Sequence, residues 1–262
     1  MIVAGVDIGA ATAKTVILDS DGVLSSSIMA TGSSVARAAE VVTEEALDKV
    51  GLSMAQLGYV ISTGYGRRAV PFSNKALTEI ICHAVGINSV MPQARTVIDI
   101  GGQDSKVIGL DDNGNVINFV MNDKCAAGTG RFLEVMAKVL EVGIDEMGFT
   151  SLLSKNPCQV SSTCTVFAET EVVSLRADGR TREDLIAGIH KAMSHRVVIM
   201  GRTVGFNQDV VFTGGVAKNI GVKKALEDEI GLEIVVPEEP QITGALGAAI
   251  LARSEYGKLH KN

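Results

Sequence analysis

An acid, a glycine and a lysine occur twice in this chain at one spacing, and the combination is typical of phosphate binding. Residues 6–14 are Val-Asp-Ile-Gly-Ala-Ala-Thr-Ala-Lys, and residues 98–106 are Ile-Asp-Ile-Gly-Gly-Gln-Asp-Ser-Lys. Glycine lets backbone amides approach phosphate oxygens, and an aspartate can hold Mg²⁺ through water. The repeat therefore predicts two phosphate loops facing one cleft, with Asp7 and Asp99 as the acids.

The elements that position these loops repeat as well. Each copy is predicted to be an apolar strand, a tight glycine turn, a second strand and a hairpin turn. The hairpin turn is Asp21-Gly22 in the first copy and Asn113-Gly114 in the second, at the same offset as the loops. Two unrelated hairpins are the alternative, but the shared spacing favours a duplication.

Strands alternate with helices along the chain, which indicates an α/β protein. Thr63-Gly64 and Thr213-Gly214 each follow an apolar run and are candidate equivalents in the two halves. Hydrophobic spacing predicts the other elements. They are strands at 2–8, 13–19, 23–30, 58–62 and 209–215, and helices at 34–50, 183–202 and 244–253.

The two halves are predicted to be residues 1–92 and 93–243. The second is the longer, and its excess falls mainly at 122–200. The helix at 244–254 is expected to complete the first half, and its small residues would let it approach another backbone closely. The charged tail after Ser254 is expected to fray.

A third loop, residues 213–219, follows the strand that ends at Thr213. The exposed amides of a helix start suit phosphate or ribose oxygens, so this loop is a further candidate for nucleotide binding. The chain has neither a GxxxxGK[ST] motif nor GxGxxG after its first strand, which disfavours the better-known nucleotide folds.

Two of the four cysteines, Cys125 and Cys164, each lie near the predicted start of a helix. A helix N-terminus favours thiolate and an anionic cluster. Two cysteines cannot complete a four-thiolate shell, whereas two subunits on a two-fold axis can. Spacing alone favours a plainer interpretation, in which both are small buried residues. That interpretation is kept for Cys82 and Cys158.

Composition excludes several classes of function. The net charge of −6 argues against a nucleic-acid partner, and no apolar run reaches the length of a membrane span. The N-terminal segment lacks the basic region of a secretory signal, and the cysteine spacing does not suggest a disulfide framework. We therefore expect a protein of the reducing cytoplasm. His190 and His195 are interpreted as packing or surface residues.

The three loops together resemble those of the actin, sugar-kinase and heat-shock ATPase superfamily. The resemblance implies two ribonuclease-H-like halves with an ATP cleft between them, Asp7 and Asp99 near magnesium, and Gln103 or Asp104 orienting the attacking water. It also implies a set of nucleotide-binding residues. They are Gly9, Ala10, Ala11, Thr12, Ala13, Lys14, Gly101, Gly102, Gln103, Gly214, Gly215, Asn219 and Pro240. Lys14 could equally lie on a strand edge.

Longer motifs narrow the resemblance. Asn-Asp-Lys-Cys-Ala-Ala-Gly-Thr-Gly-Arg-Phe-Leu around Cys125 and Ser-Ser-Thr-Cys-Thr-Val-Phe-Ala-Glu around Cys164 are similar to segments of the activators of 2-hydroxyacyl-CoA dehydratases. The wider group includes the ATPase components of benzoyl-CoA reductases, and the similarity runs from about residue 2 to 252.

That resemblance implies an oxygen-sensitive homodimer with one 4Fe–4S cluster, held by Cys125 and Cys164 of both subunits. ATP, ADP and Mg²⁺ are the other expected ligands. An electron donor such as ferredoxin or flavodoxin would supply the electron. The recipient would be an iron–sulfur dehydratase, a benzoyl-CoA reductase or a double-cubane cluster protein. The helices that follow the two cysteines would link ATP to the cluster.

The first loop departs from the family pattern, Gly-Ser-Thr-Ala-Ser-Lys. Here residues 9–14 are Gly-Ala-Ala-Thr-Ala-Lys, and Thr12 is the hydroxyl that remains. Contacts to magnesium or to the γ-phosphate are therefore expected to differ. Two other functions stay open on the same fold: a small-molecule kinase, and a nucleotide-switched assembly module without redox chemistry.

Overall fold

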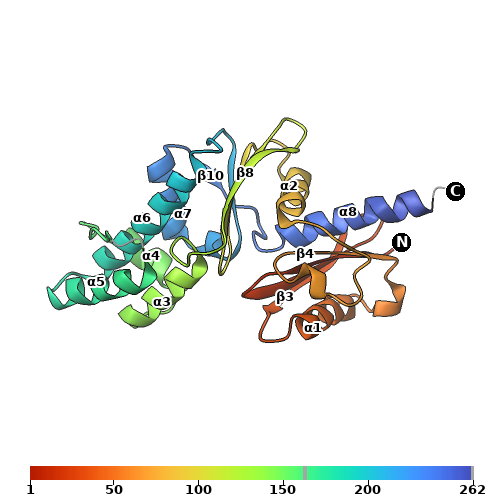
Figure 1. Ribbon diagram of the computed structural model, residues 1–262, viewed down its shortest axis with the longest axis horizontal. Helices are drawn as coiled ribbons and strands as arrows, with labels where there is room; N and C mark the ends of the chain where they lie inside the picture. Colours follow the sequence, from red (N-terminus) through yellow and green to blue (C-terminus); the bar gives the residue numbers. More distant parts are fainter. Residues whose placement is uncertain (162–163, 261–262) are drawn as a thin grey trace. The chain divides into compact units, whose positions relative to one another are not determined.

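A computed structural model of the chain describes residues 1–161 and 164–260, which divide into two compact units (Figure 1). The first unit contains residues 1–94, 110–117 and those from 238 onward. The second contains residues 95–109 and 118–237. The chain therefore passes from the first unit into the second twice, after residues 94 and 117, and returns to the first each time.

The first unit is built on a five-stranded sheet with the order β3-β2-β1-β4-β5. β1 pairs antiparallel with β2 and parallel with β4. Valine and isoleucine dominate β1, which is buried along its whole length, as expected for a central strand. The strands are β1 (Val3–Ile8), β2 (Thr12–Leu18), β3 (Val23–Ala30), β4 (Tyr59–Thr63) and β5 (Lys75–Ala76).

The second unit repeats this arrangement, because its sheet has the order β8-β7-β6-β9-β10. β6 again pairs antiparallel with the next strand and parallel with β9. The duplication predicted from the sequence is therefore confirmed. The strands are β6 (Thr96–Ile100), β7 (Ser105–Leu110), β8 (Val116–Asn122), β9 (Val210–Thr213) and β10 (Ile234–Val235).

Strand register places the repeated residues at equivalent positions. Asp7 lies opposite Lys14 on the antiparallel side of β1 and opposite Thr63 on the parallel side. The same three positions in the second unit are Asp99, Lys106 and Thr213. Thr63 and Thr213 are therefore equivalent, as the sequence predicts.

Helices cover both faces of the first sheet (Figure 1). α1 (Val35–Asp48) packs on one face through Ala39, Val42 and Ala46, which recur at helical spacing. α8 (Thr243–Leu259) covers the other face together with α2 (Glu79–Val90). Short 3₁₀ turns at Met54–Gln56 and Arg67–Ala69 complete the unit.

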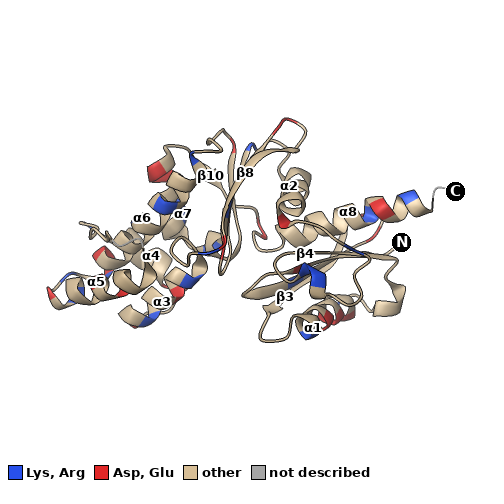
Figure 2. Ribbon diagram, viewed as in Figure 1, with Lys and Arg blue, Asp and Glu red and all other residues tan. Residues whose placement is uncertain are grey.

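α8 packs unusually closely because its inner face consists of small residues. A Cβ added at Gly5 of β1 would collide with the carbonyl of Ala245, and one added at Gly247 would collide with the carbonyl of Cys82 in α2. Figure 2 shows that α8 carries its charged residues near its C-terminal end. The close approach predicted from the small residues is confirmed.

The expected fraying after Ser254 is wrong, because α8 continues to Leu259. Side chains beyond the predicted end have partners within the unit. Glu255 forms an ion pair with Lys75 at 3.4 Å and another with Lys258 at 2.9 Å. The ring of Tyr256 lies where a side chain on Gly58 would be, so this glycine makes room for it. The final turns are thus held by tertiary contacts, which a short sequence window does not reveal.

The helices of the second unit form one core with its sheet (Figure 1). α6, the counterpart of the helix predicted at 183–202, begins after Thr181, whose hydroxyl accepts from the Asp184 N–H. The helices are α3 (Gly130–Leu140), α4 (Met147–Leu152), α5 (Thr165–Ala177), α6 (Arg182–Gly201) and α7 (Ile220–Ile230), with a 3₁₀ turn at Gly215–Lys218. Across the described residues, no helix is both long and apolar enough to span a membrane.

We predict that Gly247→Ala lowers the free energy of unfolding by about 3 kcal/mol, since the added methyl group must push α8 away from the backbone of α2. Urea denaturation measures the change. Gly257→Ala on the same helix is the matched control, because nothing lies within 4 Å of its Cβ position. That change should be neutral or should stabilise by up to about 1 kcal/mol. Equal effects at the two sites would contradict the proposed packing.

Candidate functional site

The first phosphate loop is the turn between β1 and β2. The Gly9 N–H donates to the Thr12 carbonyl at 3.0 Å, and the Thr31 hydroxyl donates to the Gly9 carbonyl at 2.8 Å. Ala10 is exposed at the tip, whereas the Ala13 side chain is fully buried in the core. Backbone groups at the tip and the half-buried Thr12 side chain are thus the polar parts of this loop within reach of a ligand.

An ion pair lies directly behind this loop. Lys14 Nζ is 3.1 Å from Asp7 Oδ2, and both side chains are largely buried. Lys14 therefore neutralises the carboxylate of the neighbouring strand, and its own strand, β2, lies inside the sheet between β1 and β3. The Lys14 ammonium also lies 3.3 Å from the position that a Cβ on Gly9 would occupy, so it packs directly against the loop.

The second loop repeats the pair in a more buried form. Lys106 Nζ lies 3.1 Å from Asp99 Oδ2 and 3.0 Å from Asp104 Oδ2, and the Lys106 side chain is 2% exposed. The Gly101 N–H donates to the Asp104 carbonyl at 3.0 Å, as the Gly9 N–H does to Thr12 in the first loop. Gln103 is exposed at the tip.

The two central aspartates differ in whether the threonine beside them donates a hydrogen bond. The Thr213 hydroxyl donates to Asp99 Oδ1 at 2.8 Å, so both oxygens of Asp99 have partners. Any contact of Asp99 with Mg²⁺ would then use the remaining lone pairs through water. The equivalent hydroxyl of Thr63 is buried and has no oxygen or nitrogen partner in the described part of the chain.

The third loop adjoins the second within the same unit. Gly214 has φ +86°, and a Cβ there would collide with the Ile100 carbonyl, so the strand end needs glycine. The Asn219 side chain caps α7 by accepting from the N–H groups of Gly221 and Val222 at 3.0 and 3.1 Å. Asn219 is thus already engaged in holding the helix that follows the loop.

His190 supports this cap from α6. Its Nε2 lies 3.3 Å from Asn219 Nδ2, and burial lowers the pKa of His190 to about 4. The neutral ring accepts from the amide of Asn219, which assigns its proton to Nδ1. His195, on the same helix, is exposed and lies 2.8 Å from Glu229 Oε1. The interpretation of these residues as packing and surface groups agrees with both positions.

The candidate nucleotide residues are divided between the two units. Asp7 and residues 9–14 belong to the first unit, as does Pro240, which is buried in the turn before α8. Asp99 and the remaining candidates belong to the second unit, which contains both candidate cluster cysteines. The remaining candidates are Gly101, Gly102, Gln103, Asp104, Gly214, Gly215 and Asn219.

The two candidate cluster cysteines are accessible to different extents. Cys164 is exposed and is the N-cap residue of α5, as predicted, although Ser162 and Thr163 lie outside the described residues. Cys125 is half-buried in the loop between β8 and α3. α3 begins only at Gly130, with Thr129 as its N-cap, so Cys125 lies in the preceding loop.

Both residues are free thiols outside the core, which suits ligands of an exposed cluster. Among the described residues, His, Cys, Asp and Glu form no group of three or more that could hold a metal ion.

The other two cysteines are buried. Burial raises the pKa of the Cys82 thiol to about 12, and it also raises the pKa of Cys158. Such thiols are poor ligands and poor nucleophiles, because the thiolate is the reactive form. Their positions fit their interpretation as packing residues.

The second phosphate loop is bonded directly to the start of α3. The N–H groups of Gly130 and Arg131 donate to the carbonyls of Gly101 and Gly102, each at 2.8 Å. A Cβ on Gly130 would lie 3.1 Å from the Gly101 oxygen and 3.3 Å from the Gly102 Cα. This contact was not predicted from the sequence, although the Gly-Thr-Gly at the start of the helix is a signal of close backbone approach.

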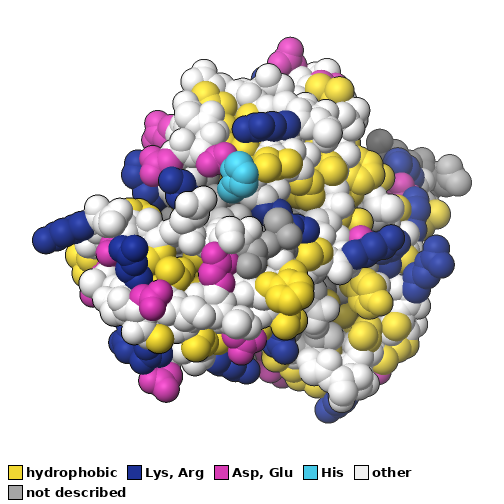
Figure 3. All heavy atoms as spheres, turned by 60° about the vertical axis from the view of Figure 1, so that its left-hand side comes forward, with side chains coloured by type: hydrophobic (Ala, Val, Ile, Leu, Met, Phe, Trp, Pro, Cys, Tyr) yellow, Lys and Arg dark blue, Asp and Glu magenta, His cyan; other side chains and the backbone are white. Residues whose placement is uncertain are grey.

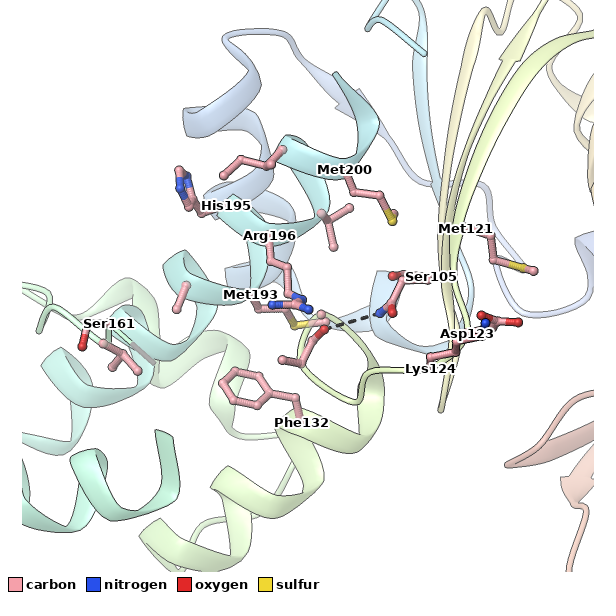
Figure 4. Close-up of a pocket in the computed structure, with 17 residues that line it drawn as sticks. Ser105, Met121, Asp123, Lys124, Phe132, Ser161, Met193, His195, Arg196 and Met200 are labelled. Carbon is pink, nitrogen blue, oxygen red and sulfur yellow. Dashed lines mark hydrogen bonds between the residues drawn. The ribbon is translucent and has the colours of Figure 1, made fainter. Parts of the chain in front are cut away.

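A cavity of about 790 Å³ lies beside the Cys125 loop, within the second unit (Figure 4). Its walls are the loop, the end of β8 and one face of α6. Met193, Met200 and Phe132 supply much of the apolar lining, and the Arg196 side chain points into the cavity. The loop that carries Cys125 is therefore only partly backed by packed core.

The model of the BadF/BadG/BcrA/BcrD ATPase family matches residues 4–252. The chain belongs to this family. Its sequence is 46% identical over 262 residues to the 2-hydroxyisocaproyl-CoA dehydratase activator of Clostridioides difficile, covering 100% of this chain and 98% of the relative. It is 43% identical over 256 residues to the (R)-2-hydroxyglutaryl-CoA dehydratase activating ATPase of Acidaminococcus fermentans, covering 97% and 98%. The resemblance seen in the motifs is confirmed.

Solved structures of family members share the fold. The activator of the 2-hydroxyisocaproyl-CoA dehydratase from Clostridium difficile, with bound ADPNP, has a TM-score of 0.94 and 45% identity, covering 100% of this chain and 97% of that one. A glucokinase of the ROK family from Streptomyces griseus has a TM-score of 0.57 at 13% identity, covering 97% and 100%. That second likeness extends to the fold alone. The expected actin-like and sugar-kinase-like ATPase fold is confirmed.

We predict that stability falls as the pH drops from about 6.5 toward 4, by up to about 3 kcal/mol from His190 alone. In this window the unfolded chain binds a proton at His190 that the folded chain does not, so acid favours unfolding; above pH 6.5 the contribution is fully present. Urea unfolding of His190→Gln should show a shallower loss of stability across this window. An unchanged slope in this variant would contradict the assignment.

Proposed function

We propose that this chain is an ATP-dependent electron donor that activates a partner iron–sulfur enzyme, of the 2-hydroxyacyl-CoA dehydratase or benzoyl-CoA reductase type. Family membership and the names of its relatives support an activating ATPase. The observation that carries the proposal is that both candidate cluster cysteines lie in the unit that contains the second phosphate loop.

Cys125 and Cys164 are the proposed ligands of one 4Fe–4S cluster, shared by two copies of the chain. The cluster would supply one-electron transfer when bound, taking its electron from a ferredoxin- or flavodoxin-type donor and passing it to the partner's iron–sulfur group. A second copy is also suggested by exposed hydrophobic side chains on the helix that Cys164 begins. Val166 and Phe167 are 66% and 68% exposed, and hydrophobic groups reach the surface on this side of the molecule (Figure 3).

ATP is assigned to the three glycine-containing loops. Their backbone amides would bind phosphate oxygens, and Asp7 and Asp99 would hold Mg²⁺ through water, each held in place by its ion pair with a lysine. Gln103, exposed at its loop tip, or Asp104 would orient the attacking water. The loss of hydroxyls at Ala10, Ala11 and Ala13 leaves backbone groups and Thr12 to serve the first loop.

Communication between ATP and the cluster is proposed to run through the start of α3. The carbonyls of Gly101 and Gly102 hold the N–H groups of Gly130 and Arg131, so a shift of the loop on hydrolysis would move the end of the Cys125 segment. A cluster's potential is sensitive to hydrogen bonds, charge and solvent around it. A small movement of this segment would therefore alter electron transfer.

We expect anaerobically purified protein to contain about four iron and four sulfide per dimer, since four thiolates hold a 4Fe–4S cluster. Cys125→Ala and Cys164→Ala should each lose the iron and the visible absorbance. Cys158→Ala, which removes a buried thiol, is the control and should keep both. A colourless, iron-free wild type that cannot be reconstituted would refute the cluster and favour a kinase or a nucleotide-switched assembly module.

We further expect the cluster potential to differ between the ADP-bound and the ATP-analogue-bound protein. Gly130→Ala should reduce this difference, because the added Cβ disturbs the contact with Gly101 and Gly102. Gly143→Ala, in the loop after α3, is the matched control, since its Cβ would meet only the flexible side chain of Glu146 at 3.4 Å. Redox titration with each nucleotide measures the effect. Equal potentials in both nucleotide states of the wild type would disprove the coupling.

A further inference from the structure

Asn122, the last residue of β8, holds both backbone polar groups of Cys125 with one side chain. Its Oδ1 accepts from the Cys125 N–H at 3.1 Å, and its Nδ2 donates to the Cys125 carbonyl at 2.8 Å. The same Nδ2 lies 3.5 Å from the Ala127 carbonyl, the contact drawn as a dashed line in Figure 4. The side chain thus bridges the strand end and the cysteine loop.

This geometry requires a carboxamide of this length. One atom must accept from an N–H while the other donates to a carbonyl, and asparagine offers both. The two contacts also fix which end of the amide is nitrogen. Aspartate could accept from the Cys125 N–H, but its second oxygen would face the Cys125 carbonyl and repel it. Leucine has a similar shape and offers neither group.

Hydrogen bonds from Asn122 are needed to hold the loop in place, because the side of the loop that faces the cavity is only partly packed. Asp123, Lys124, Ala127 and Gly128 line the 790 Å³ cavity, so residues on both sides of Cys125 border an open space as well as packed atoms (Figure 4). A well-packed loop is fixed by contacts on all sides. Here the position of Cys125 depends instead on directional bonds from the strand end.

The far end of the loop is fixed differently. The Thr129 N–H and hydroxyl both donate to the Ala126 carbonyl, at 3.0 and 2.7 Å, and Gly130 is bonded to the second phosphate loop. The cysteine is therefore held from β8 on one side and joined to the nucleotide loop on the other. Asn122 supplies the first of these anchors.

We propose that Asn122 is the positioning residue of Cys125: its carboxamide sets the direction in which the thiol leaves the loop. This role rests on the proposed function only for the identity of the ligand that Cys125 binds. The two hydrogen bonds from the Asn122 side chain to Cys125, the amide clamp, are present in the protein without any cluster. Loss of the clamp frees the cysteine loop while leaving α3 and α5 in place.

The test uses iron-free full-length protein and measures the rates at which iodoacetamide alkylates Cys125 and Cys164, by peptide mass spectrometry. Asn122→Leu should raise the rate at Cys125 about three- to tenfold, the factor expected from losing hydrogen bonds of ordinary strength, and leave Cys164 unchanged. Asn122→Asp should give a rise in the same direction. It tests the proposal with a single-atom change, should the leucine variant fold poorly.

Asn118→Leu is the matched control. Asn118 lies on the same strand four residues earlier, so its side chain is on the same face of the sheet, and its amide donates to the Thr203 carbonyl rather than to the cysteine loop. This variant should keep the wild-type ratio of the two alkylation rates. An equal ratio in Asn122→Leu, Asn122→Asp and Asn118→Leu would overturn the proposal.

A second readout follows the cluster after anaerobic reconstitution. In Asn122→Leu, a chelator should remove iron several-fold faster than from the wild type or from Asn118→Leu. If the wild type binds no iron, the proposed function fails, and the alkylation ratio still decides whether Asn122 positions Cys125. If the wild type binds iron and the alkylation ratios are unchanged, the cluster stands and the positioning role is refuted.

Discussion

A buried lysine that neutralises the aspartate at the end of the central strand is the constraint on which each half of the chain depends. A carboxylate removed from water is costly unless it is paired, so Asp7 needs Lys14 and Asp99 needs Lys106. Because the pair spans two antiparallel strands, it also fixes their register and the length of the turn between them. The glycine turn, with its backbone amides, can then project from a rigid base.

The outline of the fold could be predicted from the sequence. The duplication and the hydrophobic spacing indicate strands and helices whose pattern lies within short stretches of the chain. The equivalence of Thr63 and Thr213 followed from their place after two apolar runs, and strand register confirms it. The end of α8 was not accessible, since Glu255 and Tyr256 find partners far away in the chain. Without those partners, the charged residues of this segment predict an exposed, frayed end.

The candidate site was predicted less completely, for a physical reason. Residue types indicated the candidate phosphate loops and the two candidate cluster cysteines. Hydrogen bonds between backbone groups, in contrast, leave almost no trace in side-chain chemistry. The hydrogen bond from the Gly130 N–H to the Gly101 carbonyl is one of these. A glycine in the sequence indicates that another backbone comes close, but it does not indicate which one. Asn122 stood inside the recognised cysteine motif, yet its role depends on the path of the loop rather than on its neighbours in sequence.

The packing of α8 against β1 also sets the order in which the molecule can be completed during synthesis. The strand at Val3–Ile8 emerges from the ribosome well before the helix at Thr243–Leu259 that covers one of its faces. The whole of the second unit is encoded between them. A nascent chain can therefore assemble the second unit while the first sheet still exposes an apolar face, which is the kind of surface that chaperones bind. Truncation near the C-terminus would leave that face permanently uncovered.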